Sequence, residues 1–304
     1  MDLELQHLLA LGAAAAAGVV LLGALQRRRQ SADAAQAYLK GFRYVLSDEP
    51  DQAIAELTRA AQDARTLEAY FALGALFRRT GEHERAIRLH QNMLLKPDLE
   101  ARLGQQIQLE LALDYQRAGM HARALEAYQK VLEAAPSQKE ALAHLCELHE
   151  DRQDWSQAAQ AHGRLVALGE GSAGVLAHLL AEAALVEPDL DRAQAFAARA
   201  VEVDPASAHA AMALGLSYLR QKRLAEAEAA LERACEQAPD LSVRVAEALS
   251  QAAGAARAAA FFEARLAASE HAAPRLALAG RLRQAGRNDE ALAHLRRALE
   301  LDPR

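Results

Sequence analysis

The residues that could do chemistry in this sequence are mainly its eleven histidines and two cysteines, which are scattered along 304 residues. The densest group is His144, Cys146 and His149, whose imidazole and thiol groups are typical zinc ligands. No fourth ligand lies near this group in the sequence, and Cys146 falls where we expect two helices to pack. A packing cysteine flanked by surface histidines is therefore favoured over a metal site.

Motifs of catalysis and cofactor binding are missing from the sequence. It has no phosphate-binding glycine-rich loop, no nucleophile elbow and no zinc-protease helix motif. The net charge of −6 gives no reason to expect a nucleic acid partner. Cys146 and Cys235 are too far apart in the sequence to indicate a disulfide framework, which fits a reducing compartment. We therefore predict a protein that is not an enzyme and has no cofactor and no bound metal.

The composition predicts an all-α protein. The chain is 52% hydrophobic but only 4% aromatic, because its apolar share is carried by Ala and Leu. Alanine combines the best helix propensity with the least bulk, which suits closely packed helix pairs. No run of alternating β-branched residues indicates a sheet.

A pattern with a period near 34 residues organises the chain. Its anchor is an alanine expected where the second helix of each pair crosses the first: Ala53, Ala86, Ala124, Ala158, Ala193, Ala227, Ala259 and Ala291. A small residue recurs in the first helix: Gly41, Gly74, Ala112, Cys146, Ala181, Gly215 and Ala279. Glycines recur five residues before the anchor, at the expected turn: Gly81, Gly119, Gly254 and Gly286. The closing prolines are Pro136, Pro205, Pro239 and Pro303.

The stretch from Gly74 to Gln91, with Tyr70 and Leu73 before it, resembles one tetratricopeptide repeat (TPR), and the period is the TPR value. One such hairpin cannot bury its apolar face alone, so the repeats must stack. We predict about eight helix pairs over residues 34–304, arranged as a right-handed superhelix. The unit at 241–270 is the most degenerate and keeps little beyond Gly254, Ala259 and Leu266.

The uncharged stretch near the N-terminus predicts one transmembrane helix. Residues Leu5 to Gln26 carry no charge, and a helix over Leu8–Leu25 would span roughly 27 Å, close to the roughly 30 Å bilayer core. Arg27, Arg28 and Arg29 follow, which places the repeats on the cytoplasmic side. A cleaved signal peptide is the alternative, but its first residues should be basic and these are acidic. An ordinary helix of the solenoid is the third interpretation. We assign 1–26 to the anchor, 27–33 to a polar connector and 34–304 to the repeats.

The order of these features resembles the lipopolysaccharide assembly protein B family of Gram-negative bacteria. The resemblance is carried by the anchor, the Arg cluster, Tyr-x-x-Gly at Tyr38–Gly41, Leu-Ser-x-x-x-Asp-x-Ala at Leu46–Ala53 and the Gly74–Gln91 run. It implies a single-pass inner-membrane adaptor with cytoplasmic repeats. Such proteins present the lipid A-pathway deacetylase to a membrane AAA+ protease. No Cys-x-x-Cys pair occurs in the sequence, so we expect the family's C-terminal rubredoxin-like zinc domain to be lacking.

The expected binding surface is the concave one, which first helices line in TPR arrays. Projecting the register onto the first three repeats gives a candidate partner-binding groove of aromatic and basic residues: Tyr38, Phe42, Phe71, Arg78, Arg79, Gln116 and Arg117. The same projection places His178 and His209 on the first helices of repeats five and six. Arginine can hold carboxylates in bidentate geometry while aromatic rings anchor side chains. The alternative for each residue is an ordinary solvated helix face.

A second function remains open at this point. The chain could be a general TPR scaffold for envelope or secretion machinery, exported to the periplasm with residues 1–25 as its export signal. The acidic first residues and the Arg cluster after the apolar run argue against export.

Overall fold

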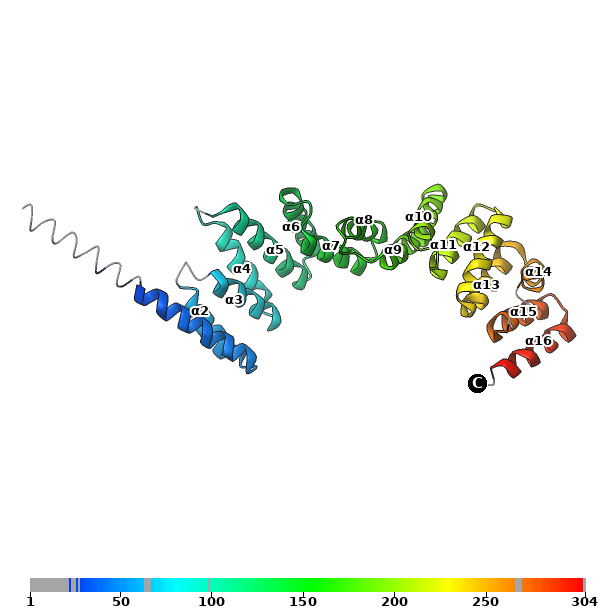
Figure 1. Cartoon of the computed structure of the whole chain (residues 1–304), viewed down its shortest axis with the longest axis horizontal. Coiled ribbons are helices and arrows are strands. Elements are labelled where there is room, and N and C mark those ends of the chain that lie inside the picture. The colour runs from blue at the N-terminus through cyan, green and yellow to red at the C-terminus, as the bar shows by residue number, and fades with distance from the viewer. Residues whose placement is uncertain are drawn as a thin grey trace, which may run out of the picture. The chain divides into compact units, whose positions relative to one another are not determined.

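The computed structural model describes residues 22, 26, 28–62, 67–97, 99–265 and 270–302, and no strand occurs among them (Figure 1). The predicted membrane anchor, residues 1–26, lies outside this range except for Leu22 and Gln26. Within the described range, no helix combines the length and the apolar character needed to cross a bilayer. The all-α prediction is confirmed for the described chain.

A helix over residues 28–46 comes first, so most of the predicted connector is helical. The remaining α-helices are α2 (Pro50–Ala60), α3 (Leu67–Arg79), α4 (His83–Leu94), α5 (Ala101–Arg117), α6 (His121–Ala134), α7 (Lys139–Asp151), α8 (Trp155–Ala167), α9 (Ala173–Val186), α10 (Leu190–Val203), α11 (Ala208–Arg220), α12 (Leu224–Gln237), α13 (Ser242–Ala253), α14 (Ala255–Arg265), α15 (Ala272–Gln284) and α16 (Asn288–Leu301). A short 3₁₀ helix, η1 (Pro239–Leu241), precedes α13.

These helices form eight consecutive antiparallel pairs in two compact units, residues 1–136 and 137–304. The first unit contains the pair of helix 28–46 with α2, then α3–α4 and α5–α6. The second contains the five pairs from α7–α8 to α15–α16. Both units contain first helices of neighbouring pairs that contact each other, as α3 does with α5 and α9 with α11. This is the TPR arrangement that the period predicts.

The alanine anchors are confirmed as the crossing points of the pairs. All eight are buried, from Ala53 at 0% exposure to Ala291 at 3%. The small first-helix positions are confirmed as well. A Cβ on Gly215 would lie 2.5 Å from Cγ of Leu231, and one on Gly74 would overlap the imidazole of His90. Close approach of the two helices is therefore why these positions exclude larger residues.

The turn within each pair uses a left-handed backbone. The four predicted turn glycines, at 81, 119, 254 and 286, all have φ between 72° and 88°. Three residues with side chains stand at the same register, five before the anchor, and adopt φ of 56° to 62°: Asp48, Gln153 and Lys222. The fold imposes this conformation even where the sequence does not favour it.

Replacing Lys222 by glycine should therefore stabilise the second unit by about 0.5–1 kcal/mol. The left-handed region is unfavourable for a residue with a Cβ, and that gain exceeds glycine's greater freedom in the unfolded chain. Urea denaturation of both proteins measures the difference. The reverse change, Gly286→Ala at φ 81°, should destabilise the same unit. A loss of stability in Lys222→Gly would contradict this account.

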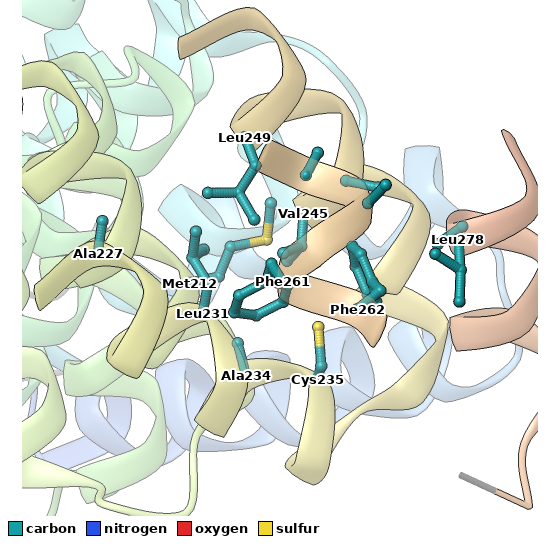
Figure 2. Packing of buried hydrophobic residues seen from close by; sticks show 14 of the residues in the cluster. Met212, Ala227, Leu231, Ala234, Cys235, Val245, Leu249, Phe261, Phe262 and Leu278 are labelled. Atoms are coloured by element: carbon teal, nitrogen blue, oxygen red, sulfur yellow. The ribbon is translucent and has the colours of Figure 1, made fainter. Parts of the chain in front are cut away.

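The degenerate seventh repeat is held by two phenylalanines that do not belong to the repeat motif. Phe261 and Phe262 of α14 are 1% and 0% exposed, and their rings meet edge to face at 5.0 Å between centroids. Figure 2 shows them among Met212, Leu231 and Val245, side chains of α11, α12 and α13. Large aromatic side chains thus replace the missing repeat signature in this core. Leu266, which we expected to contribute, lies outside the described residues.

Candidate protein-binding site

All seven candidate groove residues lie on first helices of the first unit. Helix 28–46 carries Tyr38 and Phe42, α3 carries Phe71, Arg78 and Arg79, and α5 carries Gln116 and Arg117. Their side chains differ greatly in what they contact. The structure therefore divides the set into residues that face solvent and residues that hold the unit together.

Phe42 and Arg79 are brought together at one apolar pocket of about 210 Å³. Its lining, here called the Phe42–Arg79 pocket, comes from helix 28–46, α2 and α3: Phe42, Val45, Leu57, Ala72, Ala75, Leu76 and Arg79. Phe42 is 49% exposed, and the Arg79 side chain is 50% exposed, with its nearest carboxylate, Asp48, 3.8 Å away. Both therefore remain accessible to a partner.

Arg78 instead lies within an internal ion-pair network. Its guanidinium donates to Oδ1 of Asp114 at 2.7 Å and approaches Oε2 of Glu110 at 2.7 Å, so that it links α3 to α5. Burial lowers the pKa of Arg78, but the hydrogen bond and charges of Asp114 and Glu110 raise it above its ordinary value. The side chain is only 16% exposed. We expected Arg78 to bind a partner's carboxylate; the structure gives its charge two carboxylates of its own.

The same network contains a buried histidine that sequence reasoning missed. His90 and Asp114 are both 0% exposed, and Nδ1 of His90 lies 2.5 Å from Oδ2 of Asp114. Because the carboxylate can only accept, Nδ1 carries the proton in this bond. Phe71, a candidate groove residue, stacks on the imidazole at 6.2 Å between ring centroids. We refer to Arg78, His90, Glu110 and Asp114 as the Asp114 network.

The register of His90 could have indicated its unusual role. It stands four residues after its anchor alanine, where repeats one and six have Leu57 and Leu231. Asp114 likewise stands two residues after the small first-helix position, where Leu76 stands in repeat two. Two polar residues in neighbouring repeats, at positions where other repeats have buried leucines, are a signal for a pair between those repeats.

The remaining candidate groove residues also differ in how far their side chains are exposed. Tyr38 is partly buried and packs against the hydrophobic core that contains Leu57 and Leu73. Gln116 accepts a hydrogen bond from the hydroxyl of Tyr128 at 2.6 Å, so its amide is engaged inside the α5–α6 pair. Arg117, at the end of α5, is exposed. Phe42, Arg79 and Arg117 are therefore the candidate residues whose side chains are most open to a partner.

The two cysteines are buried and free in the structure. Burial, assisted by Glu150, raises the pKa of the Cys146 thiol to about 12, and burial raises that of Cys235 to about 11. Thiols with such pKa values stay protonated at neutral pH and are poor nucleophiles. The thiol of Cys146 donates to Oε1 of Glu150 at 3.1 Å and lies against the carbonyl of Ala158, which agrees with its packing position.

Family models described as tetratricopeptide repeat match residues 69–103, 109–173, 178–242 and 278–304. The C-terminal part of a TPR repeat-containing protein from Cytophaga hutchinsonii has a similar fold, with a TM-score of 0.51 and 11% identity. That match covers 88% of this chain and 95% of the other. At this identity the likeness concerns the fold alone.

The curated relatives of this chain point to a narrower family than the repeat models do. Lipopolysaccharide assembly protein B of Escherichia coli K12 is 30% identical over 209 residues, which is 67% of this chain and 54% of the relative. The protein of the same name from Haemophilus influenzae is 25% identical over 215 residues, with the same shares. The chain thus spans about half the length of the curated relatives it matches. It belongs to the tetratricopeptide-repeat proteins and is a homologue of lipopolysaccharide assembly protein B.

Proposed function

We propose that this chain is a non-enzymatic adaptor that binds proteins through the first-helix surface of its first unit and acts in lipopolysaccharide assembly. The observation that carries protein binding is the Phe42–Arg79 pocket. There an exposed aromatic ring and a partly exposed guanidinium border an apolar floor. This combination suits a peptide segment that offers an apolar side chain beside a carboxylate.

Helix 28–46 extends the apolar part of this surface. Leu39 and Leu46 are 68% and 74% exposed, and they stand three residues before and four residues after Phe42. Residues at these spacings lie on one face of a helix. Several large apolar side chains exposed on one face are typical of a surface that contacts another protein. Arg117, in the repeat that follows that of Arg79, adds a second accessible positive charge.

The proposal includes attachment to the bacterial inner membrane through residues 1–26, with the repeats facing the cytoplasm. The uncharged stretch from Leu5 to Gln26 and the arginines after it support this. As partners we propose a lipid A-pathway deacetylase and a membrane AAA+ protease, and homology to lipopolysaccharide assembly protein B supports this choice. Anchoring would raise the effective concentration of a soluble partner near a membrane-bound one.

Pull-down from detergent-solubilised membranes of the native organism tests the proposal. The wild-type chain should recover the deacetylase or the protease, and Phe42→Ala/Arg79→Glu/Arg117→Glu should reduce that recovery at least tenfold. Loss of one anchoring side chain at an interface already weakens binding by about this factor. A chain without residues 1–26 should leave the membrane fraction.

Arg88→Glu is the matched control. Arg88 lies on the second helix α4 of the same unit and is 65% exposed, so reversal of its charge should leave recovery unchanged. Arg78 is deliberately kept, because its loss would disrupt the Asp114 network. Equal recovery by the wild-type and triple-variant chains would exclude this surface. Recovery of other envelope proteins alone would retain protein binding but reject the lipid A role.

A further inference from the structure

Three potential metal ligands converge on the first-helix surface of the second unit. His178 and Glu182 stand one turn apart on α9, so their side chains share one face of that helix. His209 lies in the first turn of α11, the first helix of the next repeat, which contacts α9 directly. One ligand atom from each of the three lies within 4.8 Å of the other two.

The geometry is close to that of an assembled site. Nε2 of His209 is 2.8 Å from Oε1 of Glu182, and the two imidazole rings lie 5.1 Å apart between centroids. Ligand atoms around a tetrahedral zinc ion, each about 2.1 Å from the metal, are roughly 3.4 Å from one another. Small rotations of side chains on two packed helices would bring all three atoms to that separation.

The ligand types favour a transition metal. Two imidazole nitrogens and one carboxylate are the three-ligand set of many zinc sites, whereas Mg²⁺ and Ca²⁺ prefer oxygen ligands alone. His209 and Glu182 are 30% and 25% exposed, and His178 is exposed. Helices α9 and α11 thus position the three ligands, and the side of the site away from these helices faces solvent. A fourth coordination position on that side could be occupied by water or by a partner's side chain.

We propose that His178, Glu182 and His209 form a binding site for a divalent transition metal, with Zn²⁺ the preferred ion. A purely structural interpretation would limit Glu182 and His209 to a hydrogen bond between repeats. It leaves His178 only its ring contact with His209 and does not use the imidazole nitrogens, one of which lies within 4.8 Å of the ligand atoms of both partners. This proposal is independent of the proposed function, which rests on the first unit.

Isothermal titration of the tag-free full chain with ZnCl₂ tests the site. We expect one ion to bind per chain. The variants His178→Ala and Glu182→Gln should each weaken Zn²⁺ binding at least tenfold. Even the loss of a residue that only orients a ligand weakens metal binding by about 10–100-fold. Titration with Co²⁺ should produce visible absorption bands in the wild-type chain that both variants lack.

His144→Ala is the matched control, because His144 on α7 of the same unit also stands beside a glutamate, Glu147 at 3.3 Å. Among the described residues, this pair does not belong to a group of three potential metal ligands. It should bind Zn²⁺ like the wild-type chain. Zn²⁺ should also raise the Tm of the wild-type chain but not that of Glu182→Gln. Absence of saturable Zn²⁺ binding, or equal affinity in the wild type and both site variants, would overturn the proposal.

Discussion

Replacing Asp114 by alanine should lower the free energy of unfolding of the first unit by about 3–5 kcal/mol. Asp114 is fully buried and accepts hydrogen bonds from both Arg78 and His90. Alanine would leave the Arg78 guanidinium with Glu110 alone and the Nδ1 proton of His90 without its acceptor. An ion that stays buried without its partner is far more destabilising than the loss of an exposed ion pair.

Urea denaturation followed by circular dichroism measures this loss. Hydrogen-exchange mass spectrometry should locate it as faster exchange of α3, α4 and α5. The only tryptophan, Trp155, lies in the second unit, so its fluorescence cannot serve as the local reporter. The control is Asp48→Asn, which removes a carboxylate that is 94% exposed and 3.8 Å from Arg79. It should change stability by less than about 0.5 kcal/mol.

A triple variant distinguishes an unpartnered charge from a general packing defect. Arg78→Met/His90→Leu/Asp114→Leu removes the three most buried members of the network together and leaves only Glu110, whose side chain is 21% exposed. Leucine already stands at the His90 and Asp114 positions in other repeats, as Leu57 and Leu76. Replacing a whole buried ionic group by apolar residues is often neutral. The triple variant should therefore recover most of the stability that Asp114→Ala loses. If Asp114→Ala itself were as mild as Asp48→Asn, the network would have no structural importance.

Phe261→Ala should destabilise the second unit by about 3–5 kcal/mol, the usual effect of removing a buried phenylalanine. The ring is 1% exposed and lies in the core of α11 to α14, against the edge of Phe262 (Figure 2). Its neighbours Met212, Leu231 and Val245 are themselves buried in this core, so they could fill the cavity only in part. The loss therefore includes both apolar burial and the contacts of the cavity lining.

Urea denaturation followed by circular dichroism and by Trp155 fluorescence measures this effect. Val243→Ala in the same repeat is the control, because Val243 is 47% exposed on α13 and alanine is a better helix former. It should stay within about 0.5 kcal/mol of the wild type. Equal stabilities of the two variants would mean that repeat seven is not held by its phenylalanines.

The sequence alone was sufficient to predict the repeat architecture. The anchor alanines, from Ala53 to Ala291, and the close-approach positions such as Gly215 were located correctly because each is decided locally. One helix crosses its partner at a fixed place in every pair, and only a small side chain fits there. The four turn glycines follow for the same local reason, since the turn needs a positive φ.

Tertiary structure decided the contacts between repeats. Arg78 meets Asp114 across 36 residues and His209 meets Glu182 across 27. Such pairings depend on how far one helix pair is rotated and shifted against the next, which helical periodicity does not specify. The sequence therefore suggested Arg78 as a partner-binding residue, although its side chain contacts Asp114 and Glu110 in an internal network. It placed His178 and His209 on the correct helices without showing that they converge.

The left-handed turns show the same division. A glycine at this turn can be predicted from its conformational freedom, but Asp48, Gln153 and Lys222 adopt the same φ because the packed helices on either side leave no alternative. Local preference thus determined which helices form and where they cross. Packing between repeats determined which side chains meet, and with it the pocket at Phe42, the Asp114 network and the cluster around Glu182.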